Sequence, residues 1–283
     1  YTVSGHTYLS RRVPFHGRGR VIGIFETSWA SALLIGAPIV AVLINAFGWR
    51  GPFIAMLIAA ILVAVLVATT TDAVDPTEDS IVATPRRVRL TPHAWRLVAA
   101  VAAINMAGLT TIVIAGTWLD DRLGVSTGGV GLVAMAFGLA ELTSSVSSAT
   151  FSDRIGKSAS TRLALALLLV GAAIMTQAGS SLPIGVLGLL CFFLGFEYAI
   201  VTSFSIVSEA MPDARGRTLV VSSAAGTTAR GIGTVASGAL YVRYGISGPV
   251  ALTSVAAIIA IFLLSTGSTS VSRARLREQP ATH

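Results

Sequence analysis

Eight apolar segments, each about long enough to cross a lipid bilayer, dominate this sequence. A hydrocarbon core about 30 Å thick is crossed by about 20 helical residues. Between clusters of charged and turn-forming residues, such segments occupy residues 21–44, 52–67, 97–119, 129–150, 163–178, 183–207, 219–242 and 249–266. Only 12% of the 283 residues are charged, about half the roughly 25% typical of globular chains. So little polar surface cannot cover eight buried helices in water, and the sequence therefore predicts an all-α, multi-pass membrane protein.

The basic residues predict how the chain is oriented. One alternate set of connections between the segments carries sixteen of them and the opposite set carries three, while Arg230 falls inside a segment. Because cytoplasmic loops are enriched in Lys and Arg, the first set is predicted to be cytoplasmic. Both termini are then cytoplasmic and the protein lies in the cell's cytoplasmic membrane. The net charge is +7, but the basic residues lie in short clusters between apolar segments and not on one face, which argues against a nucleic-acid partner.

The chain contains an internal repeat. When it is shifted by 197 positions, residues 18–52 align without a gap on residues 215–249. The coincidences fall on the residue types that set turns and loops: Arg18 on Arg215, Arg20 on Arg217, Gly36 on Gly233, Leu43 on Leu240, Gly48 on Gly245, Gly51 on Gly248 and Pro52 on Pro249. Two copies with the same orientation, separated by an even number of spans, form a parallel repeat. This symmetry is typical of transporters built from two six-helix halves.

Three motifs, in this order, carry a resemblance to a known family. They are residues 18–53 with Arg18-Gly19-Arg20, Gly36-Ala37-Pro38 and Gly48-Trp49-Arg50-Gly51-Pro52-Phe53; the stretch Phe151-Ser152-Asp153-Arg154-Ile155-Gly156-Lys157; and the stretch Glu209-Ala210-Met211-Pro212-Asp213-Ala214-Arg215-Gly216-Arg217. The chain resembles the major facilitator superfamily, in particular its drug and metabolite exporters, from helix five to helix twelve. The motifs resemble the fifth helix with the start of the sixth, the loop between helices eight and nine, and the loop between helices ten and eleven.

The resemblance implies a domain organisation. Residues 1–70 correspond to the end of the N-terminal half, with a stub of helix four and helices five and six. Residues 71–94 form a cytoplasmic linker, 95–267 the C-terminal six-helix half, and 268–283 a cytoplasmic tail. By the repeat offset, about a hundred residues carrying helices one to three and most of four are expected to lie outside this chain.

Four ionisable residues lie inside predicted spans: Glu26, Glu141, Glu197 and Arg230. Each costs about 2.5–3.5 kcal/mol at the centre of a membrane helix on insertion scales, so each is a candidate functional residue. The resemblance places all four spans at or beside the central cavity, whereas the spans matching the peripheral helices six, nine and twelve carry no charge.

Each candidate has a functional and a structural interpretation. Glu141 and Glu197 lie near the membrane midplane, where a carboxylate can exchange a proton, or can pair permanently with Arg230 or with hydroxyl groups. Arg230 can bind an anionic group of a substrate, but a carboxylate partner is favoured because glutamates outnumber it. For Glu26 an ion pair near the cytoplasmic mouth is favoured, and for Trp29 packing. Asn105 suits interhelical hydrogen bonding and cavity lining equally well.

Two further sets of residues have predicted roles. By resemblance, Asp153, Arg154, Gly156 and Lys157 form a cytoplasmic gate motif, although an ordinary positively charged loop would also explain them. Gly36, Pro38 and Gly233 are predicted helix-packing positions, because small residues allow membrane helices to approach closely.

The predicted function is secondary active transport: proton-coupled efflux of a small organic molecule by alternating access. Import of a metabolite by proton symport is the alternative in direction, and a non-transporting or inactive membrane protein is the alternative in class, since half of the cavity is expected outside the chain. An enzyme is not predicted, because the four histidines lie near ends or loops, Cys191 stands alone and no zinc-protease motif occurs. No metal or other cofactor is predicted. The expected partners are the lipid bilayer, protons and the substrate, and the expected state is a monomer.

Overall fold

The computed structural model describes residues 31–70, 89–211 and 214–266. Within these ranges every regular element is a helix: η1 (Ala32–Gly36), α3 (Ala37–Phe47), α4 (Arg50–Thr70), α5 (Pro92–Leu123), α6 (Thr127–Ile155), α7 (Lys157–Gln177), α8 (Leu182–Ala210), α9 (Arg215–Tyr244) and α10 (Ser247–Ser265). The all-α prediction is confirmed. Seven of the predicted segments each correspond to one helix, and the described part of the first corresponds to η1 and α3 together.

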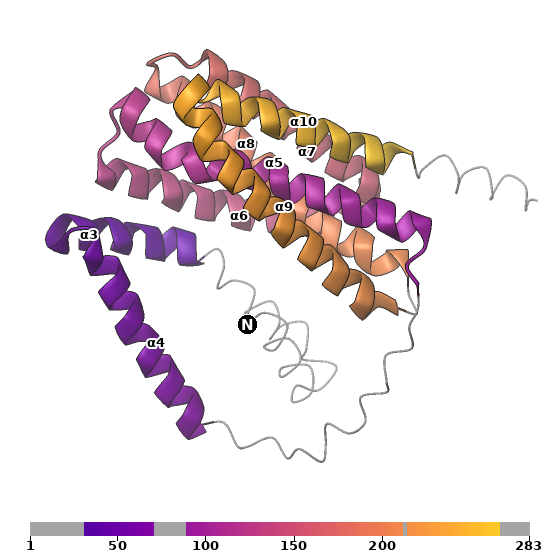
Figure 1. The fold of residues 1–283 in the computed structure, drawn as a ribbon, viewed down its shortest axis with the longest axis horizontal. Helices are drawn as coiled ribbons and strands as arrows, with labels where there is room; N and C mark the ends of the chain where they lie inside the picture. Colours follow the sequence, from indigo (N-terminus) through magenta and orange to yellow (C-terminus); the bar gives the residue numbers. More distant parts are fainter. Residues whose placement is uncertain (1–30, 71–88, 212–213, 267–283) are drawn as a thin grey trace, which may run out of the picture.

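Helices α5 to α10 form one bundle (Figure 1). α8 packs against α5, α6, α7 and α9, and α5 also packs against α9 and α10. The largest fully buried side chains come from α5, α7 and α8, among them Trp118, Leu165 and Phe192. Hydroxyl groups add hydrogen bonds between helices: Thr253 Oγ1 on α10 donates to the carbonyl of Ala107 on α5 (2.8 Å). Such bonds hold helices together where lipid supplies little hydrophobic driving force.

The first described helices, η1, α3 and α4, stand partly apart from this bundle (Figure 1). α3 contacts the bundle at α6. The two helices are close at Gly131 of α6, where an added β-carbon would lie 3.0 Å from the β-carbon of Ala41 and 3.8 Å from the α-carbon of Pro38. Pro38 therefore lies at the contact between α3 and α6. The π-helical stretch η1 ends at Gly36, two residues before Pro38. Proline has no N–H and its ring crowds the carbonyl four residues earlier, which disturbs the regular α-helical hydrogen bonds of that turn.

Six of the described helices are both long and apolar enough to span a membrane by length and composition: α4, α5, α6, α7, α8 and α10. The predicted span at 219–242 lies within the 30-residue helix α9. The glycine, serine, threonine and arginine residues of α9 make it less apolar than the six helices above. The segment Ala32–Phe47 forms a shorter apolar helix within the described residues. Of α4, only Gly51 and Pro52 are buried, so its apolar side chains face outward.

Several helices extend beyond the predicted apolar segments. α5 begins at Pro92 rather than at residue 95, because the Thr91 side chain accepts a hydrogen bond from the N–H of Ala94 and caps the helix; proline at the first position costs no hydrogen bond. The predicted loop 151–157 is helical except at Gly156, whose φ of 91° separates α6 from α7. Likewise, Arg215–Arg217 already belong to α9. Residues 71–88 of the predicted linker and the tail lie outside the described residues.

The internal repeat extends to the backbone conformation of its turns. Gly48 ends α3 with φ 69° and Gly245 ends α9 with φ 61°, and each donates its N–H to the residue four positions earlier at 2.8 Å, Ile44 and Tyr241 respectively. A β-carbon added to Gly51 would lie 2.8 Å from the carbonyl oxygen of Leu43, and one added to Gly248 would lie 2.6 Å from that of Leu240. Each pair of positions is related by the same 197-residue offset, so the two helix pairs share one turn geometry.

This shared geometry predicts the effect of substituting Gly248. Gly248→Ala forces a β-carbon against a backbone carbonyl, which cannot move as a flexible side chain can, so we expect a loss of about 1–3 kcal/mol in stability and a lower midpoint in a thermal unfolding scan. Gly238→Ala on α9 is the control, since a β-carbon there meets nothing within 4 Å and alanine favours a helix. Equal midpoints for the two variants would show that the turn tolerates a side chain.

Candidate functional site

Four of the predicted site residues converge in the bundle, one from each of four helices. Asn105 lies on α5, Glu141 on α6, Glu197 on α8 and Arg230 on α9, each in the middle third of its helix. The side chain of Glu197 interacts electrostatically with both Glu141 and Arg230, and Arg230 is hydrogen-bonded to Asn105. The structure therefore joins residues up to 125 positions apart into one polar cluster.

Arg230 has a neutral partner within this cluster. Its Nη2 donates to Oδ1 of Asn105 at 2.8 Å, although the sequence favoured a carboxylate partner. Asn105 is almost fully buried, with 5% of its surface exposed, whereas Arg230 is exposed. The guanidinium thus extends outward from the bundle while its inner edge is held by α5.

The two carboxylates lie on the neighbouring helices α6 and α8, which pack against each other. Phe137 and Phe193 stack in this interface with ring centroids 4.4 Å apart, and Ser148 and Thr202 share a hydrogen bond of 3.1 Å. These contacts fix the two helices close together. Glu141 and Glu197 are both partly exposed, and within the described part of the chain Glu197 accepts no hydrogen bond. The cluster therefore offers a carboxylate that can still bind a proton or a cation.

The predicted gate motif lies where α6 meets α7. Lys157 Nζ forms an ion pair with Glu209 at the end of α8, so the motif joins the ends of two helices. Arg154 is exposed, and Gly156 provides the tight turn. The side chain of Asp153 is not among those that the structure describes.

The remaining predicted residues have different outcomes. Glu26 and Trp29 lie outside the described residues, so their roles stay predictions. A β-carbon on Gly233 would lie 2.5 Å from Oγ1 of Thr110, which places this glycine at a close contact between α9 and α5. At Gly36 an added β-carbon meets nothing within 4 Å among the described residues. The described part of the chain therefore gives Gly36 no packing partner.

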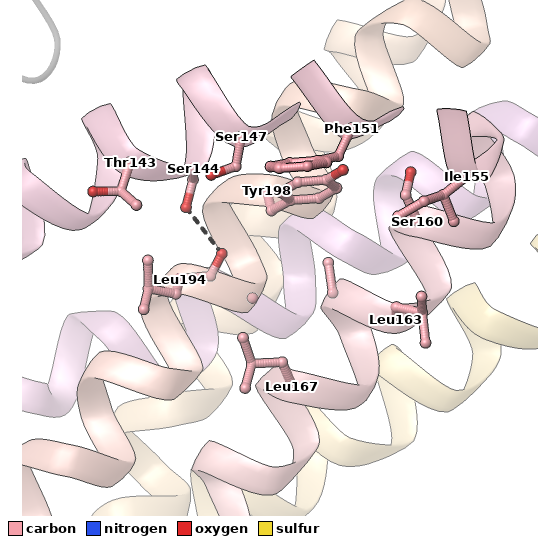
Figure 2. Close-up of a pocket in the computed structure, with 12 residues that line it drawn as sticks. Thr143, Ser144, Ser147, Phe151, Ile155, Ser160, Leu163, Leu167, Leu194 and Tyr198 are labelled. Atoms are coloured by element: carbon pink, nitrogen blue, oxygen red, sulfur yellow. Dashed lines mark hydrogen bonds between the residues drawn. The ribbon is translucent and has the colours of Figure 1, made fainter. Parts of the chain in front are cut away.

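A groove that sequence reasoning missed lies between α6, α7 and α8 (Figure 2). Its volume is about 350 Å³. The lining is mainly apolar, with hydroxyl groups at Thr143, Ser144, Ser147, Ser160 and Tyr198. Ser144 Oγ donates to the carbonyl of Leu194 at 3.2 Å, shown as the dashed line in Figure 2. None of the four cluster residues lines it. In the sequence, the groove could have been indicated only by the serines that interrupt the apolar segments of α6 and α7.

The family profile of the Major Facilitator Superfamily matches the chain twice, over residues 1–221 and 98–282. The chain belongs to the major facilitator superfamily. The uncharacterized MFS-type transporter YwfA of Bacillus subtilis (strain 168) is 27% identical over 276 residues, covering 94% of this chain and 66% of YwfA. The chain thus spans just under two thirds of the length of this relative.

Two solved structures share the fold. A bacterial homologue of the iron transporter ferroportin, in its inward-facing state, has a TM-score of 0.66 at 17% identity, covering 89% of this chain and 65% of that one. A bacterial metal transporter has a TM-score of 0.67 at 18% identity, with coverage of 90% and 68%. In the domain organisation predicted from the sequence, α5 to α10 correspond to helices seven to twelve, and α3, which contacts α6, corresponds to helix five.

The ion pair of the gate motif predicts a measurable coupling. Lys157→Ala and Glu209→Ala should each cost little stability, and the double variant should cost less than the two single changes together, by up to about 1 kcal/mol, because a partly exposed ion pair is screened by water. Thermal unfolding of the four proteins at low and high salt measures this coupling. Arg154→Ala is the control. Strictly additive effects at low salt would mean that the two charges do not interact.

Proposed function

We propose that the protein is a proton-coupled secondary transporter that exports a small organic molecule by alternating access. The central support is the cluster in the middle of the bundle, where Glu197 interacts with both Glu141 and Arg230 while accepting no hydrogen bond from the described residues. An ionisable side chain at membrane depth is costly unless it serves a pathway for ions or substrate. Three of them on three adjoining helices support such a pathway.

Proton coupling follows from the position of the carboxylates. A low dielectric and a second carboxylate nearby both make the charged form of an acid costly. A carboxylate in such a place binds a proton while it is shielded from water and releases it when the site opens to a less acidic side. Two neighbouring carboxylates can also exchange protons for a cationic group of a substrate, and this exchange is the basis of antiport.

The direction of transport is proposed from competition at the site. If a proton and a cationic substrate group compete for the same carboxylates, inward movement of protons drives outward movement of substrate. An anion bound by Arg230 together with a protonated glutamate would instead give symport and import, which is the alternative. The two structural neighbours are named as metal transporters. Within the described residues no three His, Cys, Asp or Glu side chains are grouped to hold a metal ion, so we propose an organic substrate.

Neutralising the carboxylates tests this proposal. In inverted membrane vesicles that contain the protein expressed from its complete gene, a pH dye reports proton movement when candidate organic compounds with an amino group, both simple amines and amino acids, are added. Glu197→Gln and Glu141→Gln should reduce substrate-induced collapse of the pH gradient to the level of vesicles without the protein, because an amide can neither carry a proton nor attract a cation.

The matched control for this assay is Asp120→Asn, which removes an exposed carboxylate at the end of α5. It should retain full proton movement, and all variants should be present at equal levels in the membrane. The proposal fails if both glutamine variants keep the pH response of the original protein.

A further inference from the structure

The polar cluster separates a cation from the carboxylates beside it. The Arg230 guanidinium donates to Asn105, and among the described residues it forms no ion pair with Glu197. Glu197 nevertheless interacts electrostatically with Arg230. Opposite charges this close in a low dielectric would ordinarily form a direct pair. Here a neutral side chain occupies one edge of the guanidinium instead.

Asn105 is held firmly enough to maintain this arrangement. Its Nδ2 donates to the carbonyl of Val101 at 2.9 Å, which leaves Oδ1 facing Arg230. Gly226, one turn before Arg230 on α9, lies so close to Asn105 that an added β-carbon would be 2.9 Å from Nδ2 and 3.2 Å from Cγ. Any larger residue at position 226 would displace the amide, and with it the guanidinium.

Most of the guanidinium remains available. Arginine carries five N–H donors in a fixed planar fork, and Arg230 donates one hydrogen bond to the described residues, at Nη2. A planar fork of this kind suits a carboxylate, which can accept two parallel hydrogen bonds. The exposed edge of Arg230 is therefore a carboxylate-binding element, with Glu197 on α8 as a cation-binding element beside it.

We propose that the substrate of this site is a small zwitterion of the amino-acid type. Its carboxylate binds Arg230 and its ammonium group binds Glu197, with Glu141 nearby. This inference rests on the proposed transport function and adds the substrate class. Asn105 and Gly226 are positioning residues: they hold the guanidinium away from Glu197, so that the two charges stay apart until a molecule bearing both complementary charges bridges them.

A zwitterion fits these charges better than an ion of one sign. A simple cation bound at Glu197 would place an additional positive charge next to Arg230, and a simple anion bound at Arg230 would place an additional negative charge next to Glu197. Either arrangement brings like charges together in a low dielectric, which is unfavourable. A zwitterion satisfies both elements without changing the net charge of the site.

Thermal unfolding in detergent with three pools of compounds tests the inference. The first pool contains the proteinogenic amino acids, the second their methyl esters, which are cations, and the third their N-acetyl derivatives, which are anions. The protein is expressed from its complete gene. We expect the first pool to raise the unfolding midpoint, since a ligand that binds the folded state stabilises it, and the other two to leave it unchanged.

Variants separate ligand binding from structure. Arg230→Gln should abolish the shift, whereas Arg230→Lys should retain part of it because it keeps the charge but loses the fork. Asn105→Leu and Gly226→Val should weaken the shift and require higher amino-acid concentrations. Gly238→Ala should respond as the original protein does. Each variant is compared with its own midpoint without ligand, so a loss of stability alone does not count as a loss of binding.

The inference is overturned if the ester pool gives as large a shift as the amino acids, if the shift survives in Arg230→Gln, or if no pool gives one. These outcomes are distinct from failure of the proposed function. Proton movement driven by organic amines, lost in Glu197→Gln but unaffected by Arg230→Gln, would leave the transporter intact and remove only the zwitterionic substrate.

Discussion

A guanidinium in the middle of a membrane helix needs hydrogen-bond acceptors, and the organisation of this site follows from which group supplies them. Among the described residues, the acceptor is Oδ1 of Asn105, a buried amide that itself donates to the α5 backbone. This acceptor is neutral, so it does not compensate the positive charge of Arg230. Arg230 also interacts electrostatically with Glu197 on α8. Helices α5, α8 and α9 are therefore connected by the interactions of one guanidinium as well as by packing.

Close helix packing makes this arrangement possible. The amide of Asn105 fits between α5 and α9 only because position 226 has no side chain, and Gly233 allows a second close contact seven residues further along α9. In a bilayer, small residues contribute in this way because attraction between helices depends on short distances and on hydrogen bonds rather than on the exclusion of water. The low apolarity of α9 is the consequence: a helix that carries these glycines, hydroxyl groups and Arg230 cannot also be uniformly hydrophobic.

The sequence predicted the helices and the repeat well, for physical reasons. Apolar segments of membrane length have few alternatives to helices, and Gly48 with Gly245 stood out because a turn with positive φ strongly favours glycine. The partner of Arg230 was not predictable, because counting charges favours a glutamate whereas the actual partner depends on how α5 and α9 are rotated about their axes. The helical course of residues 151–155 was hidden by polar residues that resemble a loop. The groove of Figure 2 arises from the way three helices diverge, which no local pattern encodes.

The central position of the cluster also bears on how such a site could open to either side of a membrane. Glu141 and Arg230 lie at the midpoints of α6 and α9, about 20 Å by helical rise from either end. Lys157 and Glu209 join the ends of α7 and α8, about 18 Å along α8 from Glu197 by the same rise. The ion pair at the helix ends and the charged residues at the centre are therefore connected through one continuous helix, α8. Helix α3 packs on α6, the helix that carries Glu141, so a movement of α6 would also change its contact with α3.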